Sequence, residues 1–195
     1  MKKGLTEIIY VLDRSGSMGH LTGDTIGAYN AYLREQKSFD GETKITTVLF
    51  DDKYELLFNG VSVDEAFLDH EKYFVRGMTA LYDALGKTII DVGRRLASTP
   101  ESERPEKVIF IITTDGYENA SREFTQSKVK EMIEHQQSKY NWEFLSFGAN
   151  IDSAETASSI GVCPDAAYDF EASTEGIGDM IGCCMKATSV IRNKK

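Results

Sequence analysis

Residues 6–17 read Thr6-Glu7-Ile8-Ile9-Tyr10-Val11-Leu12-Asp13-Arg14-Ser15-Gly16-Ser17, and this stretch decides the fold. An almost continuous apolar run is typical of a parallel strand that is buried on both faces of a sheet. A carboxylate directly after such a run is poorly hydrated, so Asp13 needs a partner that offsets the cost of its desolvation. The stretch therefore predicts a central strand that leads into a polar site.

A second run of the same kind, residues 107–114 (KVIFIITT), also ends in an aspartate, Asp115. Shorter strand patterns occupy residues 43–50, 142–148 and 167–170, and helical spacing of apolar residues occupies 24–39, about 79–96, 126 onward, 152–160 and about 174 onward. Strands that alternate with helices predict an α/β fold, with a doubly wound, mostly parallel six-stranded sheet and helices on both faces.

The acidic pair Asp51-Asp52 lies between strand 43–50 and the apolar residues 54–58. We interpret the pair as the tight turn of a hairpin, which makes residues 54–58 an antiparallel edge strand. A metal role for Asp51 or Asp52 is disfavoured, because aspartate is common in turns for backbone reasons alone.

Composition favours one globular domain over residues 1–195, with 41% hydrophobic residues and no biased tract. The 22 basic and 31 acidic side chains give a net charge of -9, which opposes nucleic-acid binding. No apolar run approaches the roughly 20 residues that span a bilayer, and residues 1–7 do not resemble a signal peptide. Cys163, Cys183 and Cys184 lack C-x-x-C spacing, so we expect inert thiols and a soluble protein in a reducing cytoplasm.

The residues after the first strand carry oxygen side chains at alternate positions, Asp13, Ser15 and Ser17. Ligands of open α/β sheets bind at the carboxyl ends of the strands, next to a switch in strand order, and Asp115 follows another such end. Carboxylates, hydroxyls and waters are the ligands that hard divalent cations select. The pattern therefore predicts a cation site at this edge of the sheet.

The segment Asp13-Arg14-Ser15-Gly16-Ser17 resembles the D-x-S-x-S signature of the metal-ion-dependent adhesion site of von Willebrand A domains. That family adds a Thr and an Asp from two further loops, which Thr79 in RGMTAL and Asp115 in TTDG would supply. The resemblance covers nearly the whole chain and is strongest to compact stand-alone bacterial or phage members. It implies that Asp13, Ser15, Ser17, Thr79 and Asp115 hold Mg²⁺ or Mn²⁺.

Each of these residues also has a simpler interpretation when it is taken singly. Thr79, Ser15 and Ser17 could cap the helices that follow them, and Asp115 could be an ordinary turn residue. Arg14 could steer an acidic ligand or face water, and residues 117–119 could form the rim of the site or a solvated loop. The N-termini of the following helices would favour an incoming anion.

The resemblance implies a protein-binding module whose metal captures an Asp or Glu carboxylate of a protein partner. A phosphohydrolase is the competing class, but the sequence has no P-loop, no G-x-S-x-G, no H-E-x-x-H and no second metal cluster, and its three histidines are scattered. We therefore expect neither catalytic nor organic-cofactor residues. A regulatory subunit of an AAA+ ATPase or of a stress-response complex is a further alternative, and the sequence leaves the partner and the oligomeric state open.

Overall fold

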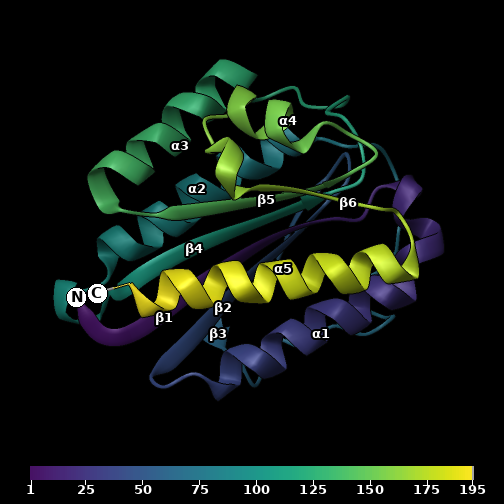
Figure 1. Ribbon diagram of the computed structural model, residues 1–195. Helices are drawn as coiled ribbons and strands as arrows, with labels where there is room; N and C mark the ends of the chain where they lie inside the picture. Colours follow the sequence, from purple (N-terminus) through teal and green to yellow (C-terminus); the bar gives the residue numbers. More distant parts are fainter. Residues whose placement is uncertain (195) are drawn as a thin grey trace.

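A single six-stranded sheet forms the centre of the computed structural model, which describes residues 1–194 (Figure 1). The strand order is β3-β2-β1-β4-β5-β6, and only the β2–β3 pair is antiparallel. The strands are β1 (Lys2–Asp13), β2 (Glu42–Phe50), β3 (Tyr54–Ser62), β4 (Pro105–Thr114), β5 (Glu143–Ala149) and β6 (Ala167–Phe170). The predicted mostly parallel sheet with one antiparallel edge strand is confirmed.

Helices cover both faces of the sheet (Figure 1). One face carries α1 (Thr22–Ser38) and α5 (Thr174–Asn193), and the other carries α2 (Leu81–Ser98), α3 (Gln126–Tyr140) and α4 (Ser153–Ser159). Strand β1 contributes side chains to the hydrophobic core on both faces of the sheet, because alternate side chains of a strand point to opposite faces. Tyr10 packs in the α1/α5 layer, whereas Ile9 and Val11 pack in the α2/α3 layer. The strand is buried on both faces, as its apolar run predicts.

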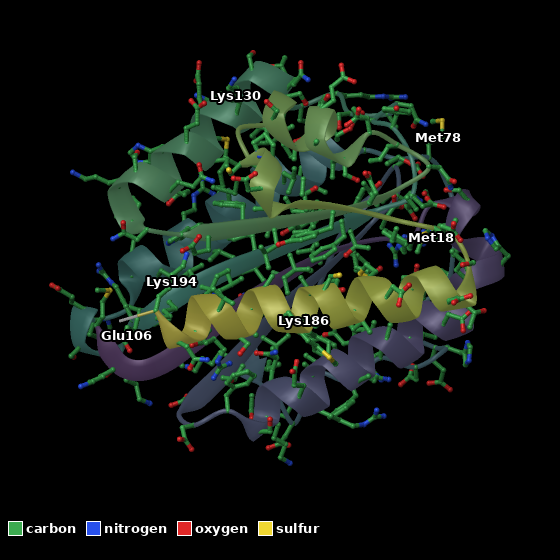
Figure 2. The ribbon with its side chains drawn as sticks, viewed as in Figure 1. Met18, Met78, Glu106, Lys130, Lys186 and Lys194 are labelled. Carbon is green, nitrogen blue, oxygen red and sulfur yellow. The ribbon has the colours of Figure 1, made fainter. Side chains whose placement is uncertain are left out.

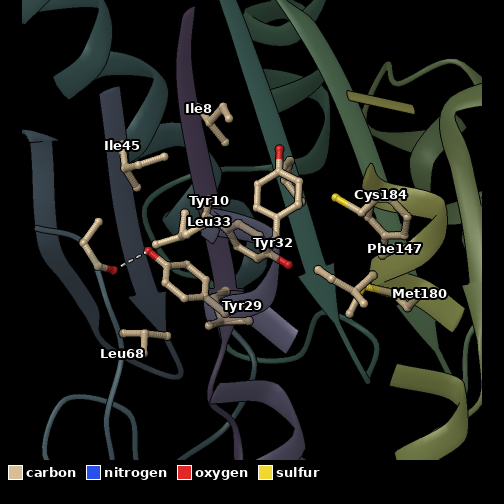
Figure 3. Packing of buried hydrophobic residues seen from close by; sticks show 14 of the residues in the cluster. Ile8, Tyr10, Tyr29, Tyr32, Leu33, Ile45, Leu68, Phe147, Met180 and Cys184 are labelled. Carbon is tan, nitrogen blue, oxygen red and sulfur yellow. Dashed lines mark hydrogen bonds between the residues drawn. The ribbon is translucent and has the colours of Figure 1, made fainter. Parts of the chain in front are cut away.

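Three buried tyrosines, Tyr10, Tyr29 and Tyr32, pack together in the α1/α5 layer (Figure 3). The ring of Tyr10 meets those of Tyr29 and Tyr32 edge to face, with centroids 5.2 and 6.0 Å apart. The Tyr29 hydroxyl lies 2.7 Å from the Thr47 hydroxyl, and the Tyr32 hydroxyl lies 3.0 Å from that of Thr188. Burial raises the pKa of all three tyrosines above the ordinary value of 10.0. The layer thus buries polar atoms without leaving these hydroxyls unpaired.

Strands β1 and β4 are neighbours in the sheet although β2, β3 and α2 separate them in the chain. From β1 the chain moves outward to β2 and β3, and after returning to β4 it moves outward in the other direction to β5 and β6. The switch in strand order therefore falls between β1 and β4, where a crevice for a ligand is expected. Asp13 ends β1 and Asp115 follows β4, so the two predicted carboxylates lie at this switch.

The sequence patterns assigned neither a helix nor a strand to residues 16–21 and 63–78. A 3-10 helix, η1 (Gly16–Leu21), follows the turn after β1. Two further 3-10 helices are η2 (Glu101–Glu103) and η3 (Pro164–Ala166). Residues 63–80 contain no helix or strand. That long segment is nevertheless fixed, because the buried Tyr73 donates a hydrogen bond of 2.8 Å to the Asp13 carbonyl. Within residues 1–194, no helix is long and apolar enough to cross a membrane.

Candidate metal centre

The turn after β1 is built around the Asp13 carboxylate, which is fully buried. Its Oδ1 accepts a hydrogen bond of 2.7 Å from the Ser15 backbone N–H, and its Oδ2 accepts one of 2.6 Å from the Thr114 hydroxyl at the end of β4. The first bond closes the turn, and the second joins the turn to the neighbouring strand. Sequence analysis missed Thr114, because a threonine inside a buried strand gives no signal of what its hydroxyl contacts.

A chain of short contacts links the predicted serines to the second carboxylate. The hydroxyls of Ser15 and Ser17 lie 3.1 Å apart, and the Ser17 hydroxyl donates to Asp115 Oδ1 at 2.5 Å. Ser15 is the N-cap residue of η1, but its side chain makes no capping hydrogen bond there and contacts Ser17 instead. Asp115 Oδ2 is buried and has no hydrogen-bond partner among the described residues.

Thr79 reaches the same place from the segment before α2. A Cβ atom on Gly116 would lie 3.8 Å from Thr79 Oγ1, which places this hydroxyl beside the residue that follows Asp115. Asn119 holds the backbone of Thr79 from the other side, since Thr79 N–H donates to Asn119 Oδ1 at 2.9 Å and Asn119 N–H donates to the Thr79 carbonyl at 3.0 Å. The cap residue of α2 is Ala80, so Thr79 does not cap that helix.

Burial raises the pKa of Asp13, and the charge of Asp115 adds to this effect, whereas hydrogen bonds from Thr114 and Ser15 lower it. Burial likewise raises the pKa of Asp115, against a lowering contribution from the Ser17 hydroxyl and from nearby His20. Two carboxylates that are held together away from water repel each other when both are ionised. A cation between them would relieve both the desolvation and the repulsion.

The five predicted residues therefore lie together and offer two carboxylates and three hydroxyls. The residues fit a hard divalent cation, because all donors are oxygen atoms and the unpartnered Asp115 Oδ2 is available to it. No group of three or more His, Cys, Asp or Glu side chains that could hold a metal occurs in residues 1–194. With only two carboxylates in the set, coordination would depend on the hydroxyls and on ligands from outside.

The structure corrects several expectations about the surroundings of the site. Arg14 neither faces water nor is free to steer a ligand, because it is fully buried and paired with Asp51 and Glu55. Asp51 follows β2 at the hairpin turn as predicted, but its carboxylate also binds arginine side chains, which a turn residue alone would not do.

The loop after Asp115 contains two exposed residues, Tyr117 and Asn119, on either side of the partly buried Glu118. Tyr117 is exposed, but Glu118 accepts hydrogen bonds from the backbone N–H groups of Tyr82, Ala120 and Ser121. Glu118 therefore occupies the N-terminus of α2, which is not free to attract an anion. Tyr117 and Asn119 are exposed, as expected at the rim, whereas Glu118 is partly buried; the hydrogen bonds of Glu118 and Asn119 hold the loop in place.

The three cysteines were expected to be inert thiols, and Cys184 is the one of the three that is buried as a small apolar residue. Cys184 is buried in α5, where burial raises its pKa, but Cys163 and Cys183 are exposed. The helical spacing in α5 identifies Cys184 as inward-facing, while the surroundings of the other two depend on how α5 and the segment before β6 pack.

Neither a family model nor a curated protein sequence matches the chain, but solved structures do. Proximal thread matrix protein 1 from the mussel byssus has a TM-score of 0.68 and 16% identity, and its form with a zinc-occupied MIDAS motif has a TM-score of 0.65 and 17% identity. The alignments cover 94% and 95% of this chain but only 46% of the mussel protein, so the chain spans less than half of that protein.

A third solved structure, that of manganese-loaded Plasmodium vivax TRAP protein, has a TM-score of 0.59 and 18% identity, and the alignment covers 83% of this chain and 64% of that one. At such low sequence identities, similarity to these structures shows the fold alone. Together with the strand order and the position of the switch point, they show that the chain has a von Willebrand A-like α/β fold.

Proposed function

We propose that the chain binds one divalent cation, Mg²⁺ or Mn²⁺, through Asp13, Ser15, Ser17, Thr79 and Asp115. The observation that carries the proposal is the chain of short contacts from Asp13 through Ser15 and Ser17 to Asp115, with Thr79 Oγ1 beside Gly116; Asp115 Oδ2 is buried and has no partner among the described residues. The zinc in the MIDAS motif of the mussel protein and the manganese in the Plasmodium protein support a divalent cation on this fold.

We further propose that the bound cation takes a carboxylate from a protein partner. Two ionised carboxylates only balance a divalent charge, and the three hydroxyls add none, so an anionic oxygen is favoured as an outside ligand. The net charge of -9 opposes acidic ligands at long range, but salt screens that field over about 10 Å at 0.1 M, whereas coordination acts at about 2 Å. The local attraction therefore dominates.

The surroundings of the site also suit a protein partner. Three exposed apolar side chains, Phe74, Met78 and Tyr117, belong to the segments that carry Thr79 and Asp115, with exposed fractions of 44%, 51% and 60%. Figure 2 shows Met78 at the end of the molecule away from the two termini marked in Figure 1. Aromatic side chains and methionine are enriched in the centres of protein interfaces. An apolar rim would keep water from a carboxylate on the metal.

Calorimetry on metal-stripped protein tests the cation site. We expect one Mg²⁺ or Mn²⁺ per chain, loss of binding in Asp13→Ala, and no change in Asp165→Ala, which removes an exposed carboxylate elsewhere. If Asp13→Ala bound metal with unchanged stoichiometry and affinity, the assignment would be wrong. Once a partner is known, EDTA should abolish its binding while NaCl weakens it only moderately, and replacing one partner Asp or Glu by Ala should remove most of the affinity.

We propose no hydrolase activity, because the site offers a Lewis acid without a placed general base or an activated nucleophile. Turnover of p-nitrophenyl phosphate that requires metal and disappears in Ser15→Ala would make the phosphohydrolase the leading alternative. A cytoplasmic location, a relation to compact bacterial or phage proteins, and a role beside an AAA+ ATPase or in a stress-response complex remain predictions from the sequence.

A further inference from the structure

Thr79 lies near the end of a segment, residues 63–80, that has no helix or strand to hold it. Backbone hydrogen bonds tie its last residues to two neighbours. Arg76 N–H donates to the Arg14 carbonyl at 2.9 Å, and Ala80 N–H donates to the Asp51 carbonyl at 2.9 Å. The position of the Thr79 hydroxyl therefore depends on contacts to the turn after β1 and to the end of β2.

The side chain of Asp51 is fully buried, and its carboxylate contacts both Arg14 and Arg76. Its Oδ2 accepts a hydrogen bond of 2.6 Å from Arg76 Nε and lies 3.3 Å from Arg14 Nε. Its Oδ1 accepts from the Lys53 backbone N–H at 2.6 Å, which fixes the orientation of the carboxyl group. One oxygen of one carboxylate thus joins two arginines from different segments.

Packing strengthens this link. The guanidinium carbons of Arg14 and Arg76 lie 5.5 and 5.4 Å from the centroid of the Phe74 ring, so one ring contacts both cations. Glu55 Oε2 lies 2.6 Å from Arg14 Nη1 and supplies a second negative charge. Two cations and two anions balance, and within this cluster the fully buried pair of Arg14 and Asp51 has strict geometry, because a buried charge needs its partner.

The two arginines stand next to metal ligands in the sequence. Arg14 lies between Asp13 and Ser15, and Arg76 lies three residues before Thr79. We propose that Asp51, through Arg14 and Arg76, is a positioning residue that holds the Thr79 hydroxyl against the turn after β1 and so sets the affinity for the cation. This inference rests on the proposed cation site, and it adds a determinant that does not itself touch the cation.

The matched test compares Arg76→Ala with Arg94→Ala, which removes an exposed arginine from α2. The side chain of Arg76 is 38% exposed, so its removal leaves the core intact. Outer-shell contacts of metal ligands typically change metal affinity by about 10–100-fold. We expect calorimetry to show an Mn²⁺ affinity loss of about this size in Arg76→Ala and in Asp51→Asn, a smaller loss in Arg76→Lys, and none in Arg94→Ala.

A double-mutant cycle distinguishes positioning from general stabilisation. If Arg76 acts through Thr79, then Arg76→Ala has no further effect on Mn²⁺ affinity when Thr79→Ala is already present. Hydrogen exchange of metal-free Arg76→Ala should be faster at the amides of residues 76–80 than in the wild type, with the sheet amides unchanged. Wild-type Mn²⁺ affinity in Arg76→Ala, or additive losses in the double variant, would overturn the inference.

The outcomes also separate this inference from the proposed function. Failure of the wild-type protein to bind Mn²⁺ would overturn both. Tight binding by the wild type that Asp13→Ala abolishes and Arg76→Ala leaves unchanged would overturn only the positioning role. If Asp51→Asn proved too unstable to purify, Arg76→Lys and Arg76→Ala would still decide the matter.

Discussion

Thr114→Val removes a single hydroxyl from the floor of the candidate metal centre. In the wild type this hydroxyl donates to Asp13 Oδ2 at 2.6 Å, while Asp13 Oδ1 accepts from the Ser15 N–H. Valine has nearly the same shape as threonine, so the buried strand keeps its packing. The variant removes this hydrogen bond to the carboxylate together with a longer contact of 3.1 Å from the same hydroxyl to the Gly116 carbonyl.

Two arguments give the same magnitude for the effect on metal binding. A hydrogen bond to a charged group contributes about 1.5–3 kcal/mol, and the loss of an outer-shell contact lowers metal affinity about 10–100-fold, which corresponds to about 1.4–2.8 kcal/mol. The hydrogen bond from Thr114 lowers the pKa of Asp13 against burial, which raises it. Without this bond the pKa of Asp13 rises further, and protons compete with the cation at a higher pH.

The assay is Mn²⁺ calorimetry on metal-stripped protein across pH 5 to 8. We expect affinity to fall as pH falls, because the folded-state pKa of Asp13 is raised and its protonated form does not bind metal. In Thr114→Val the fall should begin at a higher pH. Thr113→Val is the matched control, since its hydroxyl lies 3.5 Å from that of Tyr10 in the α1/α5 layer. Equal affinities and equal pH profiles for both variants would refute the reasoning.

Gly77→Ala should destabilise the fold by about 1–3 kcal/mol and weaken Mn²⁺ binding, because Gly77 has φ +66° and a Cβ there would overlap Asp52. Gly93→Ala should instead stabilise the fold by about 0.5–1 kcal/mol in urea unfolding, because a Cβ at Gly93 meets nothing within 4 Å. The pKa of Tyr32 is raised in the folded state, so its contribution to stability is complete below pH 10 and declines as the pH rises above 10. Tyr32→Phe should therefore reduce the loss of unfolding free energy above pH 10 by about 1.4 kcal/mol per pH unit. Urea titrations at pH 9 and 11 measure this difference. Arg95→Met should cost about 3 kcal/mol, because it leaves the buried carboxylate of Glu7 without its cation, and adding Glu7→Gln should restore most of the unfolding free energy.

The order of strands and helices followed from the sequence because local patterns carried it. The runs 6–12 and 107–114 are each followed by an aspartate, and their almost continuous apolar character is typical of strands buried on both faces. The helical pattern that begins at residue 126 corresponds to α3, and in the structure the hydroxyl of the preceding Thr125 accepts a hydrogen bond from Lys128 N–H at 3.3 Å. The structure of residues 63–78 could not be predicted from the sequence, since an irregular segment has no periodicity and is held in part by distant groups such as the Asp13 carbonyl.

The metal-ligand set could be named from the sequence because its residue types and order match a known signature and because parallel strands bring their carboxyl ends to one edge. What holds those ligands could not be named. Arg14, Asp51, Arg76 and Thr114 lie in strand ends and loops whose side chains meet only after β1, β2 and β4 are placed side by side. Sequence patterns report which residues must be buried, whereas the pairing of buried charges depends on distances that only the tertiary structure sets.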